Sequence, residues 1–130
     1  MNEQIRRFAD LDRVIHEPAR LMVVALLSEI EEGDFLYLLR ETGMSKGNLS
    51  SHLARLEAAG YVSVTKTYRG KIPMTLCRLT DAGRAAFDEY RAALKESLEA
   101  MSTPATPRPA ALEHPLNGKR GGTLYELAYA

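Results

Sequence analysis

Cationic and amide side chains gather in the middle of this 130-residue chain, at spacings that suit contact with a nucleic acid. Lys46 and Asn48 lie two residues apart, Arg55 lies about two helical turns further on, and Arg69 and Lys71 flank a glycine. Lysine and arginine bind phosphate oxygens and guanine edges, and asparagine pairs with adenine. These residues predict a DNA contact that is made from two separate segments of the chain.

The charge of the chain is strongly segregated, although its formal net charge is zero. Residues 46–84 contain seven basic and two acidic side chains, whereas residues 1–45 contain five basic and nine acidic ones. A basic segment on an otherwise acidic chain is typical of an electrostatic footprint for nucleic acid. A solvated basic surface without a partner is the alternative, and charge alone does not decide between the two.

The composition excludes several other classes of protein. With 45% apolar and 26% charged residues, the chain is typical of one soluble globular domain. The longest apolar run, Leu21–Leu27, is far shorter than the roughly 20 residues that a membrane-spanning helix needs. The first residues do not have the pattern of a secretory signal, and the single Cys77 excludes an internal disulfide or a multi-cysteine zinc site. We therefore expect a reduced, cytoplasmic compartment.

The apolar periodicity and the capping residues predict five helices and one β-hairpin. Pro18 suits the first turn of a helix, Ser45 and Thr80 suit the N-caps of two others, and Gly43 and Gly60 suit left-handed C-caps. After Gly60 the period changes from about 3.6 to 2, as it does in strands. The expected helices cover about 5–15, 18–30, 35–42, 45–59 and 81–101, and the expected strands cover 61–68 and 72–79.

Three helices, a hairpin and a further helix are the order of a winged helix-turn-helix domain, so the predicted fold class is mainly α with a small β-hairpin wing. Leu49, Leu53 and Leu56 form one buried stripe of the fourth helix, which leaves its polar side chains facing outward. Such a recognition helix enters the major groove by its first turn, and the hairpin contacts the backbone or the minor groove. The predicted DNA-binding residues are Ser45, Lys46, Gly47, Asn48, Ser50, Ser51, His52, Arg55, Lys66, Arg69 and Lys71.

The helices that flank this unit are expected to form a homodimer. One domain makes few base contacts, whereas two copies on a palindromic operator multiply the affinity. The apolar seam of the last helix is also longer than so small a domain can cover. The domain is predicted to span residues 1–101, and the Pro- and Gly-rich residues 102–130 to form a flexible tail. The expected interface residues are Ile5, Phe8, Ala86, Tyr90, Leu94 and Leu98.

Three separated motifs follow one another in an informative order. Residues 16–20 contain His-x-Pro-x-Arg, residues 49–62 contain Leu-Ser-x-His-Leu and then Leu-Glu-x-Ala-Gly-Tyr-Val, and residues 79–83 contain Leu-Thr-x-x-Gly. In this order they resemble the ArsR- and MarR-type repressors of bacteria and archaea, over roughly residues 10–100. The resemblance implies a sequence-specific regulator of transcription, a repressor in particular, that binds double-stranded DNA.

The chain departs from the metal-sensing members of that group. Those sensors carry a Cys-x-Cys pair before the recognition helix, where this chain has Phe35-Leu36-Tyr37 and no thiol. No metal and no cofactor are therefore expected. Two modes of regulation stay open: a small apolar effector near Phe8, Leu11, Tyr90 and Leu94, or no effector at all.

An enzyme and a protein-binding module are the competing function classes. The sequence has no phosphate loop, no nucleophile elbow and no zinc-protease motif. Its adjacent carboxylates, Glu31-Glu32 and Asp88-Glu89, do not face each other on a helix, so catalysis is not predicted. A winged helix that serves protein–protein contact without specific DNA binding would expose an apolar or acidic recognition helix and wing. The basic residues of this chain favour DNA.

Overall fold

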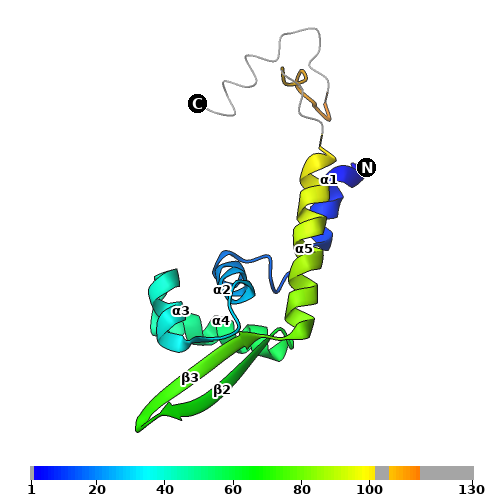
Figure 1. Ribbon diagram of the computed structural model, residues 1–130. Coiled ribbons are helices and arrows are strands. Elements are labelled where there is room, and N and C mark those ends of the chain that lie inside the picture. The colour runs from blue at the N-terminus through cyan, green and yellow to red at the C-terminus, as the bar shows by residue number, and fades with distance from the viewer. Residues whose placement is uncertain (1, 102–105, 115–130) are drawn as a thin grey trace, which may run out of the picture.

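A group of short helices and a small sheet share one apolar core, from which a long C-terminal helix rises (Figure 1). The computed structural model describes residues 2–101 and 106–114. The fold confirms the predicted winged helix-turn-helix class. The elements in chain order are α1 (Glu3–Arg6), the 3-10 helix η1 (Arg7–Asp10), α2 (Pro18–Ser28), β1 (Gly33–Asp34), α3 (Phe35–Thr42), α4 (Lys46–Ala58), β2 (Val62–Arg69), β3 (Ile72–Leu79) and α5 (Asp81–Glu99).

The helix caps that the sequence predicts are all formed. Pro18 begins α2, and the side chains of Ser45 and Thr80 each accept a hydrogen bond from the backbone N–H group three residues later. Gly43 and Gly60 have φ angles of 71° and 81°, the left-handed region that glycine occupies without strain. The boundaries of α2 to α5 therefore follow from local sequence.

The prediction of one helix over residues 5–15 is wrong. The helical backbone ends before Leu11, which is extended. The carboxylate of Asp12 then accepts the backbone N–H groups of Val14 and Ile15 at 2.9 and 3.2 Å, which fixes a tight turn. Leu11 and Ile15 still reach the core, with 5% and 0% of their surface exposed. The turn brings both side chains to the core, although their spacing in the sequence is the one that neighbours on a helical face have.

The wing is a β-hairpin as predicted, but it belongs to a three-stranded antiparallel sheet in the order β1-β3-β2. The pairing of β2 with β3 runs from Val62 opposite Leu79 to Arg69 opposite Ile72. Gly70 begins the two-residue turn with a φ of 65°, which favours glycine there. The sequence did not predict β1, because two residues are too few to show a period. Its pairing with β3 holds the base of the wing against the start of α3.

The core lies between α2, α3, α4, the base of the sheet and the first half of α5. Cys77 belongs to it as a small buried side chain, and burial raises the pKa of its thiol to about 11. The buried apolar side chains of this core are Ile15, Val23, Val24, Leu27, Leu38, Leu49, Leu53, Leu56, Val62, Cys77, Leu79, Phe87 and Tyr90.

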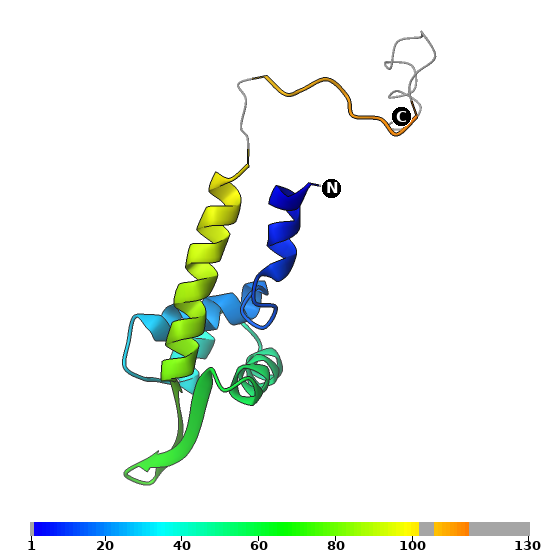
Figure 2. The same cartoon turned by 90° about the vertical axis from the view of Figure 1, so that its right-hand side faces the viewer.

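Helix α5 extends beyond the body of the molecule, and the N-terminal segment lies beside it in both views (Figures 1 and 2). Its first half is anchored in the core, where Tyr90 is 4% exposed. Around the far end the apolar side chains of Leu98, Met101 and Ile5 are 54%, 39% and 48% exposed. The predicted apolar seam of this helix is thus divided into a part that the chain covers itself and a part that it does not.

The predicted tail lies largely outside the described residues. Residues 106–114 contain no helix or strand and are exposed, and residues 102–105 and 115–130 are not described. Within the ranges that are described, none of the helices combines the length and the apolar character that crossing a membrane requires.

Gly83 lies near the start of α5, in close contact with the backbone that precedes β2. A larger side chain at this position should therefore lower the stability of the protein. A Cβ atom at Gly83 would lie 2.2 Å from the carbonyl oxygen of Tyr61, which already accepts the N–H of Thr80. We expect Gly83→Ala to lower the free energy of unfolding by about 1–3 kcal/mol in urea titrations. Gly47→Ala is the control, since its Cβ would meet nothing within 4 Å. Equal stability of wild type and Gly83→Ala would contradict this packing.

Candidate nucleic-acid interface

Helix α4 buries one face and presents the opposite face to solvent. Leu49, Leu53 and Leu56 are 0%, 4% and 0% exposed, which confirms the predicted stripe. They hold the helix against the core, so its outer face is available to a partner along its whole length. The exposed residues of that helix that the sequence predicts for DNA binding are Lys46, Gly47, Asn48, Ser50, Ser51 and Arg55.

The first turn of α4 can bind an anion through its backbone as well as its side chains. The oxygen of Ser45 accepts the N–H of Asn48 at 3.2 Å. The N–H groups of Lys46 and Gly47 come earlier in that turn, where a helix supplies no backbone acceptor. The positive end of the helix dipole and the ammonium of Lys46 add to the attraction. A phosphate oxygen is the ligand that this arrangement suits.

A hollow of about 390 Å³ separates α4 from the wing and brings together residues from both. Ser50 of α4 and Lys66 of β2, both predicted for DNA binding, line it. Thr75 of β3 lies opposite Lys66 in the strand register and was missed by the sequence analysis. The two-residue turn at the wing tip fixes this pairing, so counting back from the turn would have found it. Glu57 also lines the hollow and opposes the positive charge there.

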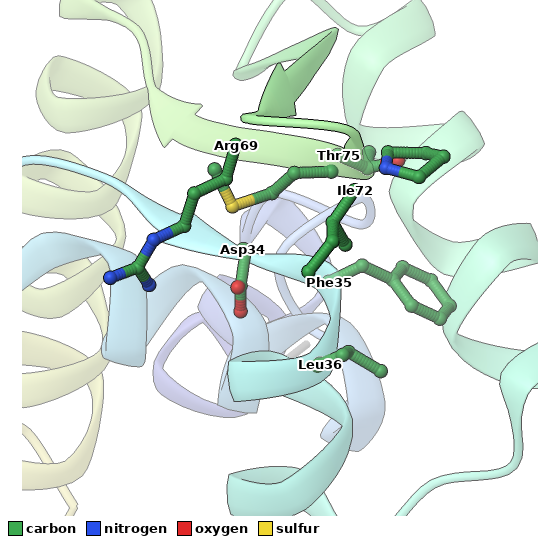
Figure 3. Close-up of a pocket in the computed structure, with 8 residues that line it drawn as sticks. Asp34, Phe35, Leu36, Arg69, Ile72 and Thr75 are labelled. Atoms are coloured by element: carbon green, nitrogen blue, oxygen red, sulfur yellow. The ribbon is translucent and has the colours of Figure 1, made fainter.

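The tip of the wing is exposed, and its charged residues are all basic. Arg69 and Lys71 are exposed, and residues 62–79 contain four basic and no acidic side chains. Figure 3 shows Arg69 and Ile72 above the start of α3, where they line a groove of about 380 Å³. The wing therefore supplies a second group of cations beyond those of α4.

One cation of the basic segment, Arg84, has a structural role and is not part of this group. The guanidinium of Arg84 donates hydrogen bonds to the carbonyl oxygens of Ser28 and Ile30 at 3.3 and 3.4 Å. Its positive charge lies at the C-terminal end of α2, where the helix dipole is negative. Arg84 contributes to the segregated charge of the sequence but is engaged by α2.

His52 differs from the other predicted DNA-binding residues because its ring is engaged inside the protein. Its Nδ1 lies 3.2 Å from Nη1 of Arg20 and 3.6 Å from Oε2 of Glu17, and 24% of its side chain is exposed. A guanidinium can only donate, so Nδ1 accepts and the ring proton is on Nε2. The ring of His52 is therefore half-buried and held by Arg20.

Arg20 joins the loop before α2 to the recognition helix. It is 9% exposed; its Nε donates to the carbonyl oxygen of Val14 at 2.5 Å, and its Nη2 donates to that of Arg13 at 3.3 Å. Burial raises the pKa of Glu17. Hydrogen bonds from the backbone N–H groups of Arg20 and Ala19, together with the charge of Arg20, outweigh that effect, so this pKa lies below its ordinary value. The sequence analysis quoted Arg20 in a motif but gave it no role.

Two further hydrogen bonds hold the same loop. The hydroxyl of Tyr61 donates to Oδ2 of Asp12 at 2.5 Å, which together with burial raises the pKa of Tyr61 to about 12. Nδ1 of His16 lies 2.7 Å from the hydroxyl oxygen of Tyr90 on α5. In the part of the chain that is described, no three His, Cys, Asp or Glu side chains lie close enough to hold a metal ion.

Known proteins with the same fold include regulators of transcription. Residues 19–98 match the family model of the winged helix DNA-binding domain. The chain is 33% identical over 79 residues to an uncharacterised protein of Methanocaldococcus jannaschii, a match that covers 60% of this chain and 85% of that protein. A transcriptional regulator homologue from Pyrococcus horikoshii OT3 superposes with a TM-score of 0.69 at 23% identity, over 75% of this chain and 96% of that one.

A regulator of the MarR family from Silicibacter pomeroyi is a further structural match. Its TM-score is 0.53 at 21% identity, over 97% of this chain and 77% of that one. The match of the family model and these shared folds confirm the predicted resemblance to winged helix regulators.

The contacts of Arg20 predict a large effect of its removal. Arg20→Ala leaves two carbonyl oxygens and Nδ1 of His52 without their donor, so we expect the free energy of unfolding to fall by about 2–3 kcal/mol. Arg20→Lys should lose nearly as much, because one ammonium cannot reproduce the planar fork. The exposed Arg13→Ala is the control and should change stability by less than about 0.5 kcal/mol. Wild-type stability of Arg20→Lys in urea would refute the role of the fork.

Proposed function

The chain belongs to the winged helix DNA-binding domain family, and from this premise we propose that it is a sequence-specific transcriptional repressor that binds a palindromic operator as a homodimer. The observation that carries the proposal is the pairing of two exposed basic elements. The first turn of α4 and the tip of the wing both present cations, and no acidic residue occurs between positions 62 and 79. Repression is inferred from the resemblance to the MarR and ArsR groups.

In the proposed complex α4 lies in the major groove and the wing reaches the neighbouring minor groove. The phosphodiester strand between these grooves then passes through the hollow between α4 and the wing. Ser50, Lys66 and Thr75 supply hydrogen-bond donors to that strand from three elements. Asn48 and Arg55 lie toward the base edges on the outer side of α4. This division assigns sequence reading to α4 and positioning to the wing.

The proposed dimer uses the far end of α5. Tyr90 lies in the core and bonds to His16, so it is engaged within its own chain, and Ala86 and Leu94 are half-buried. Leu98 and Ile5 remain exposed, and Met101 extends the same apolar end. We therefore place the centre of the interface nearer the C-terminal end of α5 than the sequence pattern alone suggested.

A small effector stays part of the proposal, with a different chemistry from the one expected. Between the N-terminal segment and α5 lies a hollow of about 330 Å³ that includes Leu11 and Tyr90. Asp10, Asp12 and Glu89 line the same hollow. Three carboxylates oppose an anionic molecule, so an effector held there would be neutral or cationic.

The proposed roles of the wing and of α4 predict that variants of the two elements weaken DNA binding in different ways. The double variant Arg69→Ala, Lys71→Ala should weaken binding to all duplexes alike and reduce the slope of log affinity against log salt by about one to two. Asn48→Ala should cost about 1–3 kcal/mol on the preferred site and little elsewhere. Fluorescence anisotropy on the site recovered by binding-site selection, and on an unrelated duplex, measures both.

The control for the wing variant removes equal charge at a distance, through Arg7→Ala with Lys95→Ala, both exposed. It should leave the salt slope unchanged. Loss of specificity with retained non-specific affinity in the wing variant would reverse the assignment. Absence of any duplex binding by wild type would favour the protein-binding module instead.

The assembly is tested by Leu98→Asp with Met101→Asp. Two carboxylates buried in an interface are strongly unfavourable, so sedimentation velocity should show a monomer where wild type is a dimer at micromolar concentration. Leu36→Asp, at a side chain that is 66% exposed on α3, is the matched control and should remain dimeric. Monomeric wild type, or a dimeric double variant, would refute the proposed interface.

A further inference from the structure

The most exposed large apolar side chains in the described ranges lie on or beside the wing. Tyr68 is 70% exposed, Ile72 is 69% exposed and Leu36 is 66% exposed. Ile72 points toward Phe35 and Leu36 and shares a groove with them (Figure 3). Tyr68 is not part of that groove, so the exposure of its ring needs a separate explanation.

Tyr68 lies on the face of the wing that looks toward α4. Side chains alternate along a strand, which places Tyr68 on the same face as Val64 and Lys66. Val64 and Lys66 line the hollow between the wing and α4. Tyr68 continues this face toward the tip, where it lies opposite Pro73 in the register. A duplex held between α4 and the wing would therefore meet the ring of Tyr68 next to the turn.

The surroundings of Tyr68 select the chemistry of its partner. Lys66 precedes it on the same face, and Arg69 and Lys71 follow it at the tip, with no acidic residue in the whole hairpin. A partner must therefore combine negative charge with an apolar surface. The minor groove of DNA has both, because phosphates form its rims and deoxyribose rings form its walls.

We propose that Tyr68 is an apolar anchor of the wing in the minor groove, and this rests on the proposed function. Its ring packs against deoxyribose and base edges while Arg69 and Lys71 bind the phosphates on either side. The ring releases no counterions, so its share of the affinity does not depend on salt. It also contacts features that every duplex has, so its share depends on groove width more than on base identity.

One titration series distinguishes the contribution of Tyr68 to DNA affinity from that of its basic neighbours. The probe is a mixed-sequence duplex of about 30 base pairs, roughly three helical turns, at several KCl concentrations. Tyr68→Ala should lower the affinity about tenfold at every salt concentration and leave the slope unchanged. Arg69→Ala should reduce the slope by about one, with a loss that shrinks as salt rises. Tyr68→Phe keeps the ring and should bind within about twofold of wild type.

A direct probe of contact is available because the chain contains no tryptophan. Tyr68→Trp places one fluorophore at the wing tip, and its emission should be quenched when the same duplex is added. Met22→Trp, at a side chain of α2 that is 42% exposed, is the control and should keep its emission. Urea unfolding of each variant verifies that it is folded before DNA is added.

The outcomes distinguish this inference from the proposed function. Wild-type affinity of Tyr68→Ala, or unquenched emission of Tyr68→Trp in a protein that still binds the duplex, overturns the anchor and leaves the DNA-binding function standing. A reduced salt slope in Tyr68→Ala also overturns it, because the ring would then act by positioning the cations. If wild type binds no duplex, the proposed function and the anchor fail together.

Discussion

A buried guanidinium must replace the hydrogen bonds that it loses to water, and Arg20 replaces them with acceptors from two other parts of the chain. The carbonyl oxygens of Arg13 and Val14 come from the loop before α2, and Nδ1 of His52 comes from α4. Because the guanidinium fork is rigid, the loop and the recognition helix are held at one relative position. The turn at Asp12 is the backbone shape that brings those two carbonyl groups within reach.

The same loop connects the elements that we propose contact DNA with the helix that we propose forms the dimer. Asp12 accepts the hydroxyl of Tyr61 next to the start of β2, and His16 bonds to Tyr90 of α5. Asp12, Tyr61 and Tyr90, which join loop, sheet and α5, are buried or half-buried, whereas His16 is exposed. In a dimer the distance between two recognition helices must match the half-site spacing of the operator. These contacts are the ones through which a change at α5 would alter that distance.

The sequence alone predicted those features of the fold that depend only on residues close together in the chain. The caps at Ser45 and Thr80, the left-handed glycines and the stripe from Leu49 to Leu56 are set within a few positions, so periodicity and residue type were sufficient. The contacts of His52 with Arg20 and of Arg84 with Ser28 join residues 32 and 56 positions apart, and spacing carries no information about them. The expected helix over 5–15 failed because the carboxylate of Asp12 forms a local turn there, and long-range hydrogen bonds to Tyr61 and Arg20, which spacing does not show, hold that turn.

In the proposed complex, small side chains on the outermost line of α4 would allow a few polar residues to read DNA. Gly47, Ser51, Ala54 and Ala58 are exposed and recur at intervals of three or four residues, on the face opposite the leucine stripe. A helix with so little bulk on that line can lie deep in the major groove, where short side chains reach base edges. In the proposed complex Lys46 and the cations of the wing then reach the phosphates. Shape along α4 and charge around it are therefore complementary, and neither alone would place Asn48 against a base.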